Sequence, residues 1–262
     1  MRGDSARAQR QTGSLSHGTI LLAVLCLALA QTPAWGVGFT TDFRIEDCTW
    51  KSRGRVNPHF LLRPGFQLAL EGEEEDDEGE LVEISAEITV LRQIERITFV
   101  SARGETLTVK TRVVEEREWE DGELVEVSRN WFAICRETSD VYYFGEDVDI
   151  YEDGEIVSHD GAWRAGEDGA LPGIIMPGTF LLGAKYYQEL APDVALDRAR
   201  NVAMGLEVST PAGTFTDCVA TVDSSPLAPG ESDEKVYCPG IGLVMDEILM
   251  LVDYGLVPPA ND

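Results

Sequence analysis

Histidine and basic residues are scarce in this chain. Its 262 residues include 3 histidines and 21 lysines and arginines, against 47 aspartates and glutamates, which gives a formal net charge of −26. Because nucleic acids and anionic lipid surfaces are bound through lysine and arginine, this balance argues against both as partners. The expected partner is instead a small apolar molecule or another protein.

Long hydrophobic runs are also missing, apart from one short stretch near the N-terminus. Residues 19–30, "TILLAVLCLALA", form 12 consecutive mostly apolar positions, whereas a membrane-spanning helix needs about 20. The stretch follows a basic start and ends in the small-residue pattern "ALA", which is typical of a signal peptide. We predict a signal peptide over residues 1–30, with residue 36 as the alternative end. The mature chain is then exported, to the periplasm or the extracellular space, without a transmembrane segment.

Several catalytic motifs are absent. The sequence has no "GxSxG", no "HExxH" and no phosphate-binding glycine loop,. Only His59 and His159 follow the predicted signal peptide, which excludes a zinc site of three histidines. His159 and Asp160 are adjacent strand residues that point to opposite faces, so we do not expect them to form a catalytic dyad. No catalytic residue and no cofactor are predicted.

Carboxylates, by contrast, are abundant. Carboxylate pairs suited to acid–base catalysis occur throughout so acidic a chain, and no single pair stands out. Because such pairs are present, a secreted hydrolase that uses one of them is an alternative function, although the sequence does not indicate which pair.

Four cysteines remain in the mature chain, and an even number in an exported protein indicates disulfides. Cys218 and Cys238 lie symmetrically about residue 228, in the middle of the turn-rich stretch "SSPLAPGES". Residues equidistant from a hairpin turn face each other at a separation that a disulfide can bridge. We predict a bond between Cys218 and Cys238, and one between Cys48 and Cys135 by elimination.

Period-two alternation dominates the chain after residue 65. Segments such as "LVEISAEITVLRQIERI" and "LVEVSRNWFAIC" are typical of half-buried antiparallel strands. We predict one mainly β domain over residues 65–257, a large twisted antiparallel meander curled into a half or full barrel, with little helix. Residues 37–64 are expected to be irregular, because "NPHFLLRPG" contains two prolines. Residues 193–207 carry apolar residues at spacings of three and four, so a short helix is an alternative there.

Three acidic segments with a glycine mark predicted hairpin turns. "DEGELVEI" at 77–84, "EDGELVEV" at 120–127 and "EDGEIVSH" at 152–159 each precede or begin an apolar-alternating run. Glycine supplies the positive φ that a tight turn requires. The segments therefore predict successive hairpins.

The carboxylates of 141–163 raise the question of a metal site. An EF-hand loop that begins at Asp147 requires glycine at its sixth position, where this chain has Glu152,. A β-hairpin with Ile150 opposite Val157 and Val148 opposite His159 is the favoured interpretation. No dedicated metal site is predicted. The tip of this hairpin is a weak calcium candidate, with three carboxylates: Glu152, Asp153 and Glu155.

Four stretches carry a resemblance to known sequences: "NPHFLLRPG" at 57–65, "VYYFGED" at 141–147, "PGIIMPG" at 172–178 and "SPLAPGESDEKVYCPGIGLV" at 225–244. Together they resemble a family of β-rich bacterial exported proteins of uncharacterised function. The resemblance implies a β-rich exported domain and no reaction. His59 stands where the family pattern has an aromatic hydroxyl, so no ligand role is assigned to it.

The predicted function is a non-enzymatic, acidic, exported binding or envelope-associated module. Its curled sheet would hold an apolar small molecule or a partner's segment in its concave face. A secreted hydrolase and a weak calcium-binding structural protein are the competing hypotheses. Eight aromatic residues are candidates to line the concave face: Trp131, Tyr142, Tyr143, Phe144, Trp163, Phe180, Tyr186 and Tyr187.

Overall fold

The computed structural model describes residues 38–52, 57–75 and 79–258, so the predicted signal peptide lies outside the described residues. The described chain belongs to one unit, Gly36–Asp262. As predicted, it is mainly β, with one antiparallel sheet of 16 strands that is not closed into a barrel. Its elements are η1 (Ile45–Asp47, a 3-10 helix), β1 (Trp50–Lys51), β2 (Phe66–Glu75), β3 (Leu81–Val100), β4 (Thr106–Glu120), β5 (Glu123–Cys135), β6 (Val141–Glu152), β7 (Glu155–Ser158), β8 (Trp163–Arg164), β9 (Leu171–Met176), β10 (Lys185–Tyr187), β11 (Glu189–Leu190), β12 (Arg198–Thr210), β13 (Gly213–Ser224), β14 (Asp233–Cys238), β15 (Gly242–Asp246) and β16 (Leu249–Leu256).

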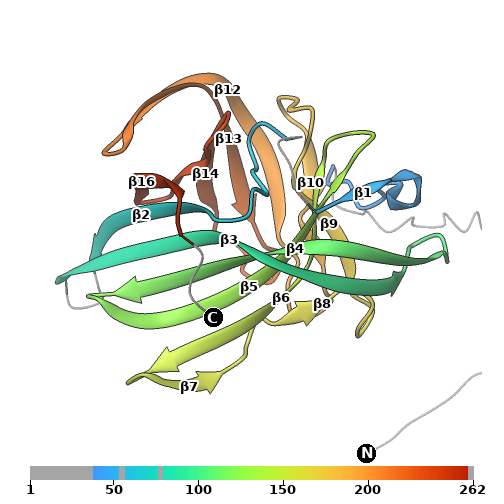
Figure 1. Ribbon diagram of the computed structural model, residues 1–262, viewed down its shortest axis with the longest axis horizontal. Helices are drawn as coiled ribbons and strands as arrows, with labels where there is room; N and C mark the ends of the chain where they lie inside the picture. The colour runs from blue at the N-terminus through green and yellow to red at the C-terminus, as the bar shows by residue number, and fades with distance from the viewer. Residues whose placement is uncertain (1–37, 53–56, 76–78, 259–262) are drawn as a thin grey trace, which may run out of the picture. The chain divides into compact units, whose positions relative to one another are not determined.

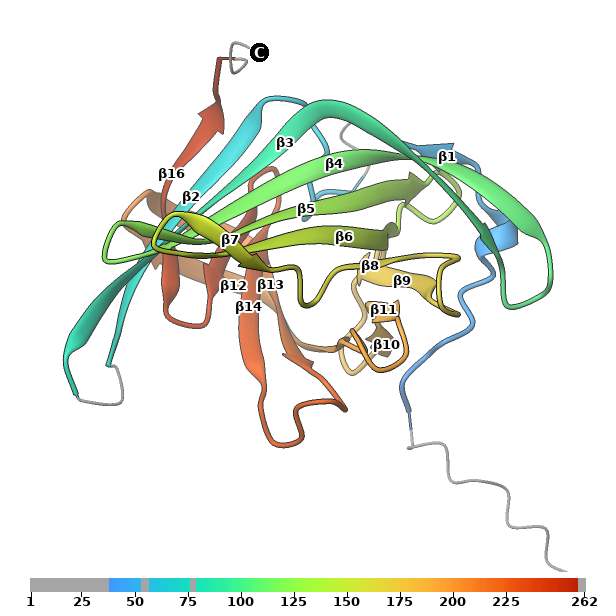
Figure 2. The ribbon, with the colours of Figure 1, turned by 90° about the horizontal axis from the view of Figure 1, so that it is seen from below.

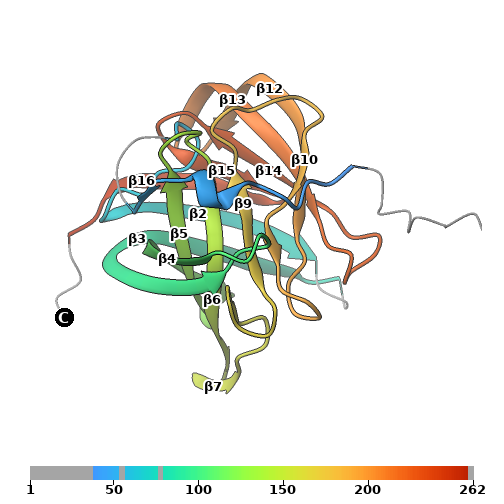
Figure 3. The ribbon, with the colours of Figure 1, turned by 90° about the vertical axis from the view of Figure 1, so that its right-hand side faces the viewer.

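The strand order explains why the sheet curls. It runs β10-β12-β13-β14-β15-β16-β2-β3-β4-β5-β6-β9-β11, with β1, β7 and β8 paired at the side. The two end strands, β10 and β11, are separated in the chain by Gln188 alone. The sheet must therefore bend until its two ends approach each other. Figures 1 and 3 show the result, with β12–β14 lying across from β3–β6.

Local turn chemistry produces the hairpins that the sequence predicts. Asp121 and Gly122 connect β4 to β5 with φ of 47° and 80°, and Asp153 and Gly154 connect β6 to β7 with φ of 52° and 78°. Two successive residues with positive φ form the turn whose twist matches that of antiparallel strands. Figure 2 shows the β6–β7 hairpin beside the long β3, β4 and β5 strands.

The alternative of a short helix over 193–207 is wrong. β12 begins at Arg198 and pairs along its length with β13. Register shifts interrupt this ladder between Asn201 and Val208. Each β-bulge adds a residue and breaks the strict alternation of side chains. The apolar residues therefore recur at spacings of three and four without forming a helix.

Both predicted disulfides are present. Cys218 and Cys238 are bonded with their Cα atoms 4.2 Å apart, and the neighbouring pair Val219 and Tyr237 confirms the predicted hairpin register. Cys48 and Cys135 are bonded with their Cα atoms 5.1 Å apart. This second bond closes a separation of 87 residues and ties the segment before β2 to the end of β5.

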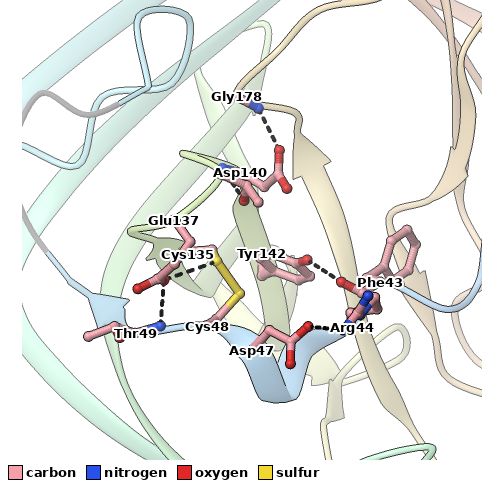
Figure 4. Close-up of a disulfide and its surroundings, with 11 residues drawn as sticks. Phe43, Arg44, Asp47, Cys48, Thr49, Cys135, Glu137, Asp140, Tyr142 and Gly178 are labelled. Atoms are coloured by element: carbon pink, nitrogen blue, oxygen red, sulfur yellow. Dashed lines mark hydrogen bonds and ion pairs between the residues drawn. A yellow bond between two sulfur atoms is a disulfide. The ribbon is translucent and has the colours of Figure 1, made fainter.

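Several contacts reinforce the Cys48–Cys135 bond (Figure 4). The Thr49 backbone N–H donates to the Glu137 carboxylate at 2.7 Å, and the Tyr142 hydroxyl donates to the Phe43 carbonyl at 3.2 Å. The rings of Phe43 and Trp50 pack edge-on against Tyr142. Residues 38–52 thus cover one face of β6, although η1 and β1 are the only regular elements among the described residues of 37–64.

Asn57 anchors the next part of the irregular segment. Its side chain is fully buried, and its Nδ2 donates to the carbonyls of Ser139, Met176 and Pro177 at 3.0–3.3 Å. Its Oδ1 accepts from the His59 backbone N–H at 2.9 Å. The "NPH" stretch is therefore held against the β5–β6 turn and the end of β9.

Replacing Asn57 by alanine is expected to lower the free energy of unfolding by about 2–4 kcal/mol, because one buried and two partly buried carbonyls lose their donor,. Urea denaturation would measure the change. Gln67→Ala is the matched control, since this amide bonds the Glu87 and Thr89 side chains nearer the surface, and we expect a loss below about 1 kcal/mol. Equal losses in the two variants would show that Asn57 is not an anchor.

Candidate functional site

A cavity of about 440 Å³ lies between strands β2–β6 and strands β14–β15, with segment 195–197 at its side. This volume is within the range that small-molecule sites occupy. Its apolar wall is formed by Phe60, Leu61, Phe66, Leu68, Ile88, Val90, Val114, Phe132, Ile175, Ile241 and Leu243. Its acidic wall is formed by Glu116, Glu118, Glu126, Glu146, Glu189, Asp197 and Asp246.

Alternation along β4 and β5 places the central carboxylates. On β4, Glu116 and Glu118 follow Val114 at intervals of two, and all three side chains line the cavity. Because strand side chains alternate between faces, the intervening Glu115 points to the other side of the sheet. On β5, Glu126 lies directly opposite Glu118. Two like charges in direct register repel each other, so both carboxylates are not readily ionised at once.

Burial and mutual repulsion shift the titration of the acidic wall. Burial, with the neighbouring carboxylate of Glu118, raises the pKa of Glu116 to about 8. Burial raises the pKa of Glu146 to about 7 and holds the pKa of Glu189 well above its usual range. The pKa values of Glu118 and Glu126 are raised for the same reason. With pKa values of about 8 and about 7, Glu116 is mostly protonated and Glu146 is partly protonated at neutral pH.

Lys235 is the one cation among the described residues that line this cavity. Its Nζ lies 2.7 Å from the Asp246 carboxylate, directly across the β14–β15 ladder. Burial by itself would lower the pKa of Lys235, but Asp246 and the nearby Tyr237 and Asp223 raise it above its usual value. The lysine is thus already paired with Asp246. In the described part of the chain, the remaining six carboxyl groups of the acidic wall make no ion pair.

Three aromatic residues of the cavity lining pack against one another. The Phe60 and Phe132 ring centroids are 4.9 Å apart, and the Tyr143 ring stacks on Phe132 at the same distance. The Tyr143 hydroxyl donates to Asn130 Oδ1 at 2.5 Å, which fixes the ring. Of the eight aromatic residues that the sequence offers as a lining, Tyr143 alone belongs to this cavity. Tyr142 and Phe144, its neighbours on β6, pack on the opposite face against Trp50.

The weak calcium candidate lies outside the cavity. Glu152 and Glu155 face each other across the β6–β7 turn, with Asp153 between them, and all three residues are exposed. Among the residues that the structure describes, no group of three or more Asp, Glu, His or Cys side chains is arranged to hold a metal ion.

The predicted register of this hairpin needs correction. Ile150 pairs with Ser158 and not with Val157, because a register shift follows the first two pairs of the hairpin. Val157 is left out of the ladder and is 50% exposed. Val148 pairs with Ser128 of β5, and His159 is not part of the β6–β7 ladder. The Val148 carbonyl nevertheless lies 2.7 Å from the His159 ring. A bulge adds one residue to one strand, so counting residues outward from the turn does not predict which residues pair beyond the bulge.

We expect sodium chloride and calcium chloride at equal ionic strength to raise the melting temperature by similar amounts, because both screen the repulsion of a strongly acidic chain. Asp153→Asn is expected to change stability by less than about 0.5 kcal/mol, since Asn-Gly also suits this turn. Differential scanning fluorimetry would measure both. A saturable shift that is specific to calcium and lost in Asp153→Asn would instead establish a site at the tip.

The two described histidines are not in the acidic cavity. His59 is half-buried beside Phe180, and this burial lowers its pKa. The His159 side chain is 67% exposed, and its Nδ1 lies 3.0 Å from Asp149 of β6. Its acidic neighbour in space is therefore Asp149 and not Asp160, whose backbone N–H bonds the Ser158 hydroxyl.

Sequence reasoning missed the whole acidic wall. One available signal was the series Val114, Glu116 and Glu118 on β4. These three residues lie on the same face of the strand, and the apolar residue is followed on that face by two acidic ones. A second signal was the series Glu126, Ser128, Asn130 and Phe132 on β5. Such polar residues at inward positions indicate a cavity wall instead of a filled core.

Comparison of the chain with protein-family models, with curated protein sequences and with solved structures found no match. In the described part of the chain, no helix is long and apolar enough to cross a membrane. The resemblance to a family of bacterial exported proteins stays a prediction that rests on four short sequence stretches.

Proposed function

We propose that the protein is an exported, acidic binding module that encloses a small molecule in the cavity between β2–β6 and β14–β15. The observation that carries this proposal is a cavity of about 440 Å³ that is lined by many apolar side chains together with a set of polar groups. Ligand sites combine a mainly apolar lining with a few polar groups that orient the ligand. The two disulfides support an oxidising destination,.

A neutral apolar dye, N-phenyl-1-naphthylamine, tests the proposal because its fluorescence rises in apolar surroundings. We expect saturable binding to the wild-type protein. Ala195 lines the cavity, whereas its neighbour Val194 does not and is 46% exposed. Ala195→Trp should fill part of the cavity and weaken binding at least tenfold, while Val194→Trp should leave it unchanged. No saturable signal, or equal binding by the two variants, would refute the proposal.

A hydrolase is the second candidate, supported by the pKa values of Glu116 and Glu146. Carboxyl groups that titrate near neutrality inside a cavity are suited to donate a proton as general acids. The test is release of nitrophenol from a panel of 4-nitrophenyl esters and glycosides at pH 7. An enzyme of this kind should lose about 100-fold or more in Glu116→Gln or Glu146→Gln. Release no faster than in buffer would reject this candidate.

A further inference from the structure

Carboxylates on the two faces of the β4–β5 hairpin differ in whether an arginine pairs with them. On the outer face, Glu115 pairs with both Arg117 and Arg129 at 2.9 and 3.1 Å, and Arg129 also pairs with Asp149 at 3.2 Å. On the cavity face, no arginine is among the described residues that line the cavity beside Glu116. Arg117 and Arg129 therefore both form their ion pairs on the side of the sheet away from the cavity.

Glu189 is the most enclosed member of the acidic wall. Glu189 is 2% exposed, and it lines the cavity from β11. One carboxylate oxygen accepts the backbone N–H of Asp197, but no cation among the described residues pairs with it. A carboxylate buried to this extent is normally matched by a cation or a metal. Burial raises the pKa of this carboxyl group, and a cation bound in the cavity would stabilise its ionised form,.

Aromatic rings lie beside these carboxylates. Tyr143 and Phe132 stack on each other, and Asn130, which fixes the Tyr143 hydroxyl, is directly opposite Glu146 in the β5–β6 ladder. Aromatic faces attract organic cations through the negative charge of the ring face, and the attraction increases when water is excluded. Carboxylates and aromatic faces in one cavity form a combination that suits an organic cation.

We infer that the ligand of this cavity is an organic cation, a protonated or quaternary amine with an apolar or aromatic body. This inference rests on the proposed binding function. The cationic end lies against the acidic wall and the rings of Phe132 and Tyr143, and the body lies against the apolar wall. An anion of the same shape is repelled, because Lys235 is already paired with Asp246.

The test compares two probes of the same shape that differ in charge: benzyltrimethylammonium and neopentylbenzene. Both displace the bound dye in a competition titration at pH 8 if they enter the cavity. We expect the cation to bind at least tenfold more tightly than its neutral isostere. This comparison uses the wild-type protein and does not depend on whether any variant folds.

Two glutamine variants then locate the effect. Glu116→Gln removes a carboxylate of the acidic wall and should reduce the preference for the cation at least threefold. Glu115→Gln removes the same charge from the same strand on the outer face and should leave the preference unchanged. Equal reduction in both variants would assign the preference to long-range charge and overturn the inference.

The outcomes separate the inference from the proposed function. Equal or tighter binding of neopentylbenzene, or no displacement by the cation while the dye still binds, overturns the inference and leaves the binding function standing. Absence of saturable dye binding together with no binding of either probe by calorimetry overturns both.

Discussion

Replacing Cys48 and Cys135 together by alanine is expected to lower the free energy of unfolding by about 4–5 kcal/mol. The bond spans 87 residues, and in the chain-entropy model the stabilisation grows with the length of the loop that a disulfide closes. The bond also holds residues 38–52 against β6, where Phe43 and Trp50 pack on Tyr142. Urea denaturation of the oxidised wild type and of the double variant measures the difference.

The Cys218–Cys238 bond provides the control for this prediction. It spans 20 residues within one hairpin, so the corresponding double alanine variant should lose about 3 kcal/mol. Backbone pairing between β13 and β14 also remains to hold its two strands together. A greater loss from this shorter loop than from the longer one would contradict the entropic account.

Stability is expected to fall as the pH rises from about 5 to 8, and Glu116 alone should contribute about 2–4 kcal/mol to this fall. Glu116 has an ordinary pKa of 4.5 when unfolded and a pKa of about 8 in the fold. Between these values the folded state holds a proton that the unfolded state has released. The free energy of unfolding therefore decreases through this window, by at most about 1.4 kcal/mol per pH unit for each such group, and levels off above it. Glu146 and Glu189 act in the same direction.

Glu116→Gln isolates the contribution of one carboxyl group. The variant should unfold with the same free energy as the wild type at pH 5 and should be more stable by about 2–3 kcal/mol at pH 8, because glutamine never ionises. Glu115→Gln should gain no stability at pH 8, since it loses two arginine partners. Chemical denaturation at several pH values would measure both. A gain of equal size in the two variants would show that net charge alone, and not burial, causes the trend.

Features set by a few neighbouring residues were predictable from the sequence. Period-two alternation indicated the mainly β fold, and Asp-Gly turns located two hairpins because positive φ at successive positions is a local property. The Cys218–Cys238 bond followed from symmetry about one turn. The same local method failed where a β-bulge intervened, both in β12 and beyond the turn at Gly154, since an inserted residue changes the face of every residue after it.

The tertiary structure alone decided what the sheet encloses. The alternation of β4 places Glu116 and Glu118 on one face, but whether that face meets solvent, a filled core or a cavity depends on strands more than 100 residues away in the chain. The curl of the sheet brings Lys235 and Asp246 to the same cavity as these carboxylates. The Cys48–Cys135 pairing was likewise reached only by elimination. The sequence by itself thus determined the strands and their turns, whereas the cavity and its carboxyl groups without ion pairs arose from long-range packing, which no local pattern encodes.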